Sequence, residues 1–399
     1  MMFVVLSVAY IVSQFFRVAN SVIAPELMTG LGIGPAAMGI ITAAFFFAFA
    51  AMQLPVGILL DRFGPRRTMA SLLFVAALGS LLFAVGESAF VLTLARALIG
   101  VGCAAGLMGS LIVIARWFPP ERFARLSSLL FTVGGVGILL GTTPLAAVSV
   151  SVGWREAFYL MAGVSALMGV LIYLRVRDLP PGSEPPAAES VREIAKGLGE
   201  VLRNRELWHI SAIQFVTYAS VLTLTGLWAG PYLEEVFHLD PLNRGHFLLA
   251  MNLATLVGVM AYSWVEQWIG SRKWTIVLGA VASIAMLALL ATRPGLPLTS
   301  ASVLLISFAL VSSFVMLLHS HARAVLPAPL MGRGLTLQNL AVFIGVAVLQ
   351  AVSGYLVQHF TVEGMSPESI YRVVFGFLAV SLTIGLMCYL PSKNVSASE

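Results

Sequence analysis

The segment GILLDRFGPRR, residues 57–67, joins two long apolar runs through a short charged stretch. Gly64 and Pro65 are typical of a tight turn, and Asp61 can accept hydrogen bonds from backbone N–H groups where a helix ends or begins. Gly57 has no side chain and allows close approach of a neighbouring helix. Arginines at such a place can pair with carboxylates and helix C-termini, and here they are Arg62, Arg66 and Arg67. The segment therefore predicts a charged connection between two membrane spans.

The flanking apolar runs belong to a series that fills the chain. Hydrophobic residues make up 59% of the sequence and charged residues only 10%, which excludes an ordinary water-soluble globule. A run of about 20 apolar residues crosses ~30 Å of hydrocarbon as a helix. The sequence therefore predicts an all-α membrane protein with twelve transmembrane helices, at 3–26, 35–60, 68–86, 90–117, 126–148, 156–176, 207–231, 245–268, 274–292, 300–322, 335–358 and 371–390.

Basic residues are distributed unevenly between alternate loops. With a cytoplasmic N-terminus, most of the 23 Lys and Arg lie in cytoplasmic loops or at the helix ends that face them. This asymmetry follows the positive-inside rule and predicts that both termini are cytoplasmic. The basic charge therefore indicates topology and no nucleic-acid partner. The Arg-, Ala- and Gly-rich composition is typical of GC-rich bacteria, so we expect a multi-pass protein of the inner (plasma) membrane.

One polar interval divides the chain into two halves. We predict an N-terminal six-helix bundle at 1–176, a cytoplasmic linker with an amphipathic helix at 177–206, a C-terminal six-helix bundle at 207–390 and a cytoplasmic tail at 391–399. In the linker, apolar residues recur at helical spacing opposite charged ones; they are Val191, Ile194, Leu198, Val201 and Leu202.

The two halves show weak internal similarity. ARWFPPERFARL (115–126) matches ARAVLPAPLMGRGL (322–335), and WREAF (154–158) matches YRVVF (371–375). Two bundles in parallel orientation predict a pseudo-two-fold axis along the membrane normal, with a substrate site at the interface of the halves.

These features resemble the major facilitator superfamily over essentially the whole chain. The segment 57–67 matches the signature that this superfamily carries between its second and third helices, and 258–273 is similar to a degenerate second copy. RALIGVG (96–102) resembles the superfamily's motif in the fourth helix, whereas the glycines of the span 126–148 only partly resemble the antiporter motif. Among its members, bacterial organic-anion and sugar-phosphate permeases are most similar in character. The resemblance implies transport by alternating access, with a latch on the cytoplasmic side formed by Gly57, Asp61, Arg62, Gly64, Arg66 and Arg67.

Arg17 places a permanent charge inside the first predicted span. At about 100° per residue, the polar side chains of this span share one arc of roughly 120°; they are Ser13, Gln14, Arg17, Asn20 and Ser21. A charge in mid-membrane costs at least ~2.5–3.5 kcal/mol, which favours a functional role. The guanidinium either binds an anionic substrate as a bidentate fork or is a buried arginine satisfied by carbonyls or Asn20.

Arg96 lies at comparable depth in the span 90–117. The resemblance implies that the first, fourth, seventh and tenth helices line the cavity, so both arginines either face one ligand or Arg96 serves packing or coupling. The matching position of the second half holds no basic residue, and the span 207–231 offers neutral polar groups instead. This favours a monocarboxylate or an amphipathic organic acid over a multivalent anion. The candidate substrate-binding residues are Ser13, Gln14, Arg17, Asn20, Arg96, Gln214 and Tyr218.

No acidic residue lies in the middle of a predicted span. The candidate coupling residues are therefore His319, Glu26 and Glu234, unless the substrate's own carboxyl, a counter-substrate or no ion at all drives transport. His319 and His321 are two residues apart and cannot share a helix face. For each, a hydrogen-bonded histidine at a helix end is the alternative to a coupling role.

Two rival functions stay open. No metalloprotease, nucleophile-elbow or C-x-x-C motif is present, so we expect neither an enzyme nor a cofactor nor a metal site. Within transport, the alternative is an exporter of hydrophobic or drug-like compounds. Outside it, the alternative is a sensor or structural protein on the same fold. We expect a monomer in the lipid bilayer whose partners are a small-molecule substrate and either a proton or a counter-substrate.

Overall fold

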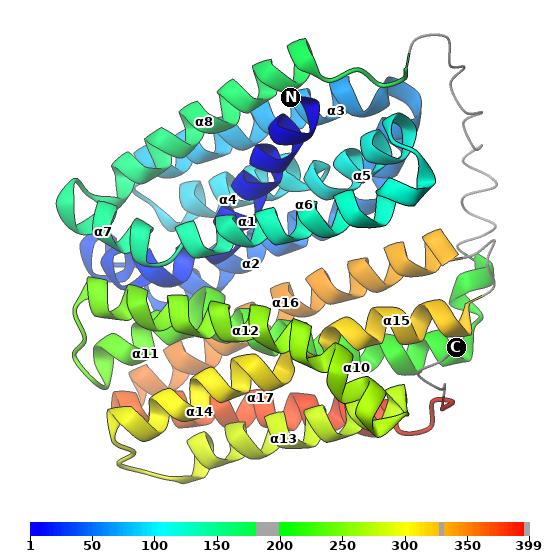
Figure 1. Ribbon diagram of the computed structural model, residues 1–399. Helices are drawn as coiled ribbons and strands as arrows, with labels where there is room; N and C mark the ends of the chain where they lie inside the picture. Colours follow the sequence, from blue (N-terminus) through cyan, green and yellow to red (C-terminus); the bar gives the residue numbers. More distant parts are fainter. Residues whose placement is uncertain (181–198, 327–330, 395–399) are drawn as a thin grey trace. The chain divides into compact units, whose positions relative to one another are not determined.

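The computed structural model describes residues 1–180, 199–326 and 331–394, and their secondary structure is helical (Figure 1). The chain forms two compact units, Met1–Ile33 with Ile41–Glu189, and Gly34–Ile40 with Ser190–Glu399. The residues of the predicted linker helix up to Leu198 lie outside the described residues, and Val201 and Leu202 are helical.

Among residues 1–180, the structure has eight helices. They are α1 (Met2–Leu31), α2 (Pro35–Ala51), α3 (Gln53–Val85), α4 (Ala89–Cys103), α5 (Gly106–Trp117), α6 (Pro120–Leu140), α7 (Thr143–Ser151) and α8 (Trp154–Arg175).

The second half contains α10 (Arg205–Thr223), the π-helical turn η1 (Leu224–Trp228), α11 (Ala229–Glu235), α12 (Pro241–Ile269), α13 (Arg272–Thr292), α14 (Leu298–Val311), the 3₁₀ turn η2 (Ser312–Phe314), α15 (Val315–Val325), α16 (Met331–Val362) and α17 (Pro367–Tyr389).

Side-chain caps fix where several of these helices begin. The side chains of Ser88, Asn204, Asp240 and Ser366 accept hydrogen bonds from backbone N–H groups of the first turn of α4, α10, α12 and α17. Eleven stretches among the described residues are long and apolar enough to cross a membrane, and the apolar α2 is shorter. The all-helical, multi-span fold predicted from the sequence is confirmed.

Five predicted spans differ from simple continuous helices. The span 35–60 is divided between α2 and α3 at Met52. The span 90–117 is divided between α4 and α5, and the span 126–148 between α6 and α7. η1 interrupts the span 207–231, and η2 interrupts the span 300–322. Two of these breaks contain polar residues, Ser312 and Ser313 in η2 and Thr142 between α6 and α7, but hydropathy averaged over a whole span reveals none of them. Mid-helix turns of these types often mark functional positions.

Glycines bring helices of the first unit into backbone contact. A Cβ atom on Gly137 of α6 would overlap the carbonyl of Ile11 in α1, and a Cβ on Gly100 of α4 would overlap the carbonyl of Phe45 in α2. The Gly-rich stretch in α6 therefore serves close packing against α1.

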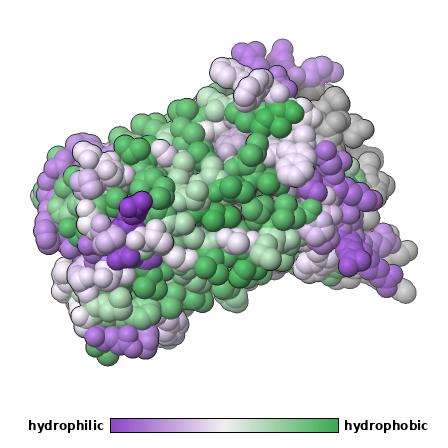
Figure 2. Space-filling view, turned by 90° about the horizontal axis from the view of Figure 1, so that it is seen from below, coloured by the Kyte–Doolittle hydropathy of each residue, from purple (hydrophilic) through white to green (hydrophobic). Residues whose placement is uncertain are grey.

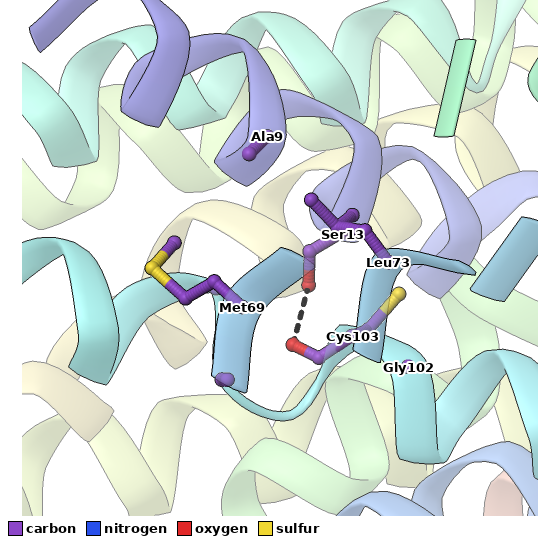
Figure 3. Close-up of a pocket in the computed structure, with 8 residues that line it drawn as sticks. Ala9, Ser13, Met69, Leu73, Gly102 and Cys103 are labelled. Atoms are coloured by element: carbon purple, nitrogen blue, oxygen red, sulfur yellow. Dashed lines mark hydrogen bonds between the residues drawn. The ribbon is translucent and has the colours of Figure 1, made fainter. Parts of the chain in front are cut away.

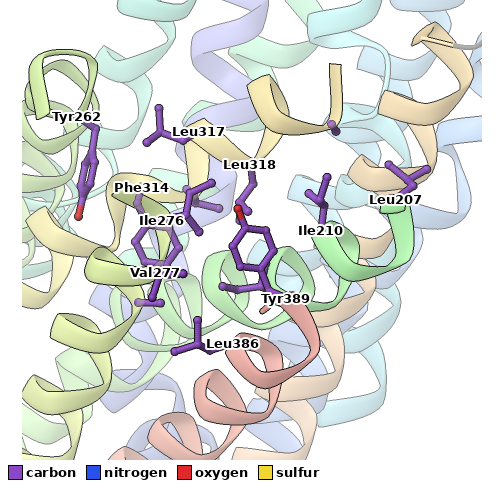
Figure 4. Packing of buried hydrophobic residues seen from close by; sticks show 14 of the residues in the cluster. Leu207, Ile210, Tyr262, Ile276, Val277, Phe314, Leu317, Leu318, Leu386 and Tyr389 are labelled. Atoms are coloured by element: carbon purple, nitrogen blue, oxygen red, sulfur yellow. The ribbon is translucent and has the colours of Figure 1, made fainter. Parts of the chain in front are cut away.

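In the second unit, side chains of α10, α13, α15 and α17 form a buried apolar core (Figure 4). Its members include Leu207, Ile210, Ile276, Phe314, Leu318, Leu386 and Tyr389. On the face seen in Figure 2, hydrophobic residues form a broad band, and hydrophilic residues gather at its ends. Large apolar side chains lie fully outside the core; Trp268, for example, is 89% exposed. Such a surface is suited to lipid rather than to water.

Candidate functional site

The polar face of α1 contacts α2 and α4 within the first unit. Asn20 Nδ2 donates to Thr42 Oγ1 at 3.0 Å, and Ser13 Oγ donates to the Cys103 carbonyl at 3.4 Å. The guanidinium of Arg17 is buried and lies 4.9 Å from the centre of the Phe49 ring. The predicted polar face therefore turns into the protein.

Arg96 on α4 lies against the same stretch of α1. Its Nη1 donates to the Phe16 carbonyl at 2.9 Å, and its guanidinium lies 4.6 Å from the centre of the Phe45 ring. The side chain is 0% exposed, and its Nε and Nη2 have no hydrogen-bond partner among the described residues. These two nitrogens form one edge of the guanidinium, and such an edge fits a carboxylate bidentately.

Two aromatic rings support the two arginines. Phe45 and Phe49 are four residues apart on α2, and their rings stack with centroids 6.1 Å apart. The Arg96 guanidinium lies over the Phe45 ring, and the Arg17 guanidinium lies over the Phe49 ring. A ring face attracts a cation but does not neutralise it. Sequence reasoning did not single out these rings, although their spacing places them on one helix face.

Two further polar atoms near Arg17 in sequence are buried without partners among the described residues. They are Gln14 Oε1 and Asn20 Oδ1, both on α1 and both hydrogen-bond acceptors. A cavity of about 10 Å³ lies beside Ser13, Met69 and Cys103 (Figure 3). This volume holds about one water molecule, so the cavity by itself does not accommodate an organic substrate.

The turn predicted at Gly64 and Pro65 lies inside α3, at the point where two helical arms meet. The backbone is not helical at this kink, where Gly64 adopts φ 78° and ψ 160°. Glycine tolerates this left-handed region without strain. We expected close helix approach at Gly57, but no atom among the described residues lies within 4 Å of a Cβ placed there. The close approach is therefore made by other glycines, such as Gly100.

Asp178, just beyond the end of α8, holds the turn in place. Its Oδ1 accepts from the Arg66 backbone N–H at 2.7 Å, and Arg66 Nε donates to the Tyr173 carbonyl at 2.6 Å. The Arg66 guanidinium also lies 4.5 Å from the centre of the Tyr173 ring. We name this set, Gly64, Arg66, Tyr173 and Asp178, the first clamp.

The second unit repeats the arrangement. Gly270, with φ 72°, precedes Ser271, whose Oγ donates to Asn394 Oδ1 at 2.8 Å. Lys273 Nζ donates to the carbonyls of Leu390 and Ser392 at 2.7 and 2.6 Å. The clamping segments align as YLRVRD (173–178) and YLPSKN (389–394), a repeat that sequence reasoning missed. The carboxylate of Asp178 corresponds to the neutral amide of Asn394.

The remaining candidates lie in three separate places. Gln214 Nε2 on α10 lies 3.0 Å from His319 Nε2 and 3.3 Å from His319 Nδ1 on α15, so the structure brings these two residues together. One turn further along α10, the Tyr218 ring meets the edge of Phe343. Glu234 forms an ion pair with Arg244, and Glu26 is partly buried in α1.

Comparison with known proteins agrees with this architecture. Residues 6–349 match the sequence model of the Major Facilitator Superfamily. A probable sulfoacetate transporter of Cupriavidus necator is 23% identical over 268 residues, which cover 64% of this chain and 60% of that protein. A probable L-galactonate transporter of Escherichia coli is 24% identical over 378 residues, which cover 87% and 80%. The chain spans about six-tenths of the length of the first curated relatives it matches.

A solved structure shares the fold. The inward-facing, unoccupied structure of a bacterial homologue of the human lysosomal transporter Spinster superposes with a TM-score of 0.80. It covers 98% of this chain and 96% of its own, at 18% sequence identity. At this identity the likeness concerns the fold alone.

Proposed function

The chain belongs to the Major Facilitator Superfamily, and from this premise we propose that it is a secondary active transporter of a small organic anion that works by alternating access. We further propose that it resides in a bacterial inner membrane with both termini cytoplasmic. The excess of Lys and Arg in alternate loops supports this orientation.

The observation that carries the proposal is the open edge of Arg96 beside the polar face of α1. Arg96 is fully buried, and it forms no ion pair among the described residues. A buried charge at this depth costs at least ~2.5–3.5 kcal/mol, and a cation–π contact offsets only about 0.5–2 kcal/mol. A bound carboxylate supplies the missing counter-charge, and Arg17 on α1 supplies a second guanidinium.

The surrounding polar atoms favour a hydroxylated monocarboxylate. Gln14 Oε1 and Asn20 Oδ1 are acceptors, so they suit the hydroxyl donors of a sugar acid. The position of Arg17 in the internal repeat falls on Leu222–Thr225, which holds no second basic residue for a multivalent anion. The relative named for L-galactonate, a sugar acid with one carboxylate, agrees with this class.

We also propose that the latch residues of segment 57–67 have a conformational role. Asp61, Arg62 and Arg67 flank the Gly64 kink, and the first clamp ties that kink to the end of α8. Rocking of a bundle needs such rigid joints between its helices, because packed elements switch between discrete arrangements.

Ligand binding by the purified protein tests the proposal. We expect L-galactonate to raise the melting temperature, and proteoliposomes to take up labelled L-galactonate. Galactitol is the matched control, because it keeps the hydroxyls and lacks the carboxylate, and it should do neither. Stabilisation by galactitol, or by lipophilic cations in preference to all anions, would refute anion transport and favour the exporter alternative.

A further inference from the structure

Three helix ends meet at one edge of the first unit. Arg175 ends α8, and its Nη1 donates to the sulfur of Met1, directly before α1, at 3.0 Å (Figure 1). Trp117 ends α5, and its Nε1 donates to the backbone carbonyl of Arg177 at 2.8 Å. These two contacts bring the ends of α1, α5 and α8 together through residues that the proposed anion site does not use.

This edge carries three guanidiniums without a paired carboxylate. Arg116 lies in the last turn of α5, Arg175 in the last turn of α8, and Arg177 two residues further on. No ion pair joins any of the three to a carboxylate among the described residues. Asp178 follows directly in sequence, but it accepts from the Arg66 N–H in the first clamp. The dipoles of α5 and α8 stabilise a cation at each helix end, yet they leave the combined positive charge without a counter-ion.

Large apolar side chains flank the same edge. Leu174, next to Arg175, is 64% exposed, and Val4 in the first turn of α1 is 61% exposed. The Tyr173 ring is exposed as well. Exposed apolar side chains of this kind mark a membrane-facing surface. Apolar groups beside a cluster of cations match a phospholipid, because its acyl chains adjoin a charged phosphate.

The matching edge of the second unit lacks the cluster. In the repeat of the clamping segments, Pro391 takes the place of Arg175, and Lys393 takes that of Arg177. The backbone N–H of Lys393 donates to Glu206 Oε2 at 2.9 Å, which places a carboxylate at that edge. The positive-inside rule applies to both halves alike. It therefore does not account for a cluster that only the first unit has among the described residues.

We propose that Arg116, Arg175 and Arg177 bind the phosphate of an anionic phospholipid whose acyl chains lie against Leu174 and Val4. Guanidinium groups bind phosphate oxygens through two parallel hydrogen bonds. Basic pockets between transmembrane helices bind anionic headgroups on the cytoplasmic side, where the proposed orientation places this edge. The bound lipid bridges α1, α5 and α8 and so stabilises the first unit. The site is independent of the carried anion, since none of its residues belongs to the arginine site of α1 and α4.

Lipid titration of the purified protein in detergent tests the proposal, with bound lipid measured by native mass spectrometry. Wild type should bind dioleoylphosphatidylglycerol more tightly than zwitterionic dioleoylphosphatidylcholine, and only the anionic lipid should raise the melting temperature. Added NaCl should weaken this preference, because salt screens exposed charges. Arg177→Gln should weaken binding of the anionic lipid by about fivefold. Trp117 bonds the backbone of residue 177, so the substitution leaves the contact between α5 and α8 intact.

Arg323→Gln is the matched control, because Arg323 is an exposed arginine in the last turn of α15, where the repeat matches Arg116. It should bind phosphatidylglycerol like wild type. Glycerophosphoglycerol, the headgroup without acyl chains, should not raise the melting temperature. Equal binding of the two lipids by wild type, an equal loss in both variants, or stabilisation by the free headgroup overturns the proposal. Arg177→Gln should keep wild-type affinity for L-galactonate, so the lipid site and anion transport stand or fall separately.

Discussion

Replacing Asp178 with alanine should weaken the joint between the Gly64 kink and the end of α8. The variant loses the carboxylate oxygen that accepts from the Arg66 N–H at 2.7 Å, at the first turn of the helical arm that follows Gly64. Loss of a cap of this kind typically costs about 1 kcal/mol. If only one of the two transport conformations contains the clamp, that energy shifts their ratio by about fivefold, since ~1.4 kcal/mol corresponds to tenfold.

The assay is L-galactonate uptake and binding on the same purified variants, together with their melting temperatures. Asp178→Ala should lower both the melting temperature and the maximal uptake rate, and the affinity should change little, because the clamp lies outside the arginine site. Asp178→Asn keeps an acceptor oxygen and should lose less on both measures. Wild-type stability and uptake in Asp178→Ala, or an equal loss in both variants, would refute the role of the carboxylate.

Two further variants test the packing and the latch. Gly100→Ala places a methyl group against the Phe45 carbonyl and should cost about 1–3 kcal/mol of stability. In Gly163→Ala the new methyl group meets no atom of the described residues within 4 Å, so this variant should melt like wild type. Equal melting temperatures of the two variants would contradict the close approach at Gly100. Asp61→Asn should slow uptake of L-galactonate more than it weakens binding, and an equal loss of both in a folded variant would argue against a conformational role.

Hydropathy predicted the helical, membrane-spanning fold because a lipid-facing helix must be apolar along its whole length. Because hydropathy measures only how apolar a span is, it did not predict where the helices are interrupted. Nothing in the apolar composition around Ala104 distinguishes a continuous helix from one with a break, because the local backbone depends on packing against neighbours. The kink at Gly64 was predicted as a turn between two helices, but the helices extend closer to it than the predicted bounds 60 and 68.

The chemical type of the candidate residues made them recognisable in the sequence, whereas the residues that contact them could not be recognised. Arg17 and Arg96 were found because a charge in an apolar run is conspicuous. The Phe45 and Phe49 rings that hold them were not, since phenylalanine is common in membrane helices. Gln214 and His319 were each singled out, but no sequence rule pairs residues more than 100 positions apart. Asp178 was missed because a charge after a helix end has many ordinary explanations.

The affinity of Arg17 variants for L-galactonate tests the central claim most directly. If the guanidinium binds the carboxylate, Arg17→Ala removes a charge-assisted hydrogen bond of about 1.5–3 kcal/mol. This corresponds to a loss of about ten- to a hundredfold in affinity. Arg17→Lys should recover only part of it, because an ammonium cannot form the bidentate fork.

The melting temperature, taken on the same samples, distinguishes binding from structure. We predict that Arg17→Ala melts at or above the wild-type temperature, since the variant removes a costly charge from the membrane interior, while its affinity falls. Unchanged affinity together with a lower melting temperature would contradict the account and make Arg17 a structural residue.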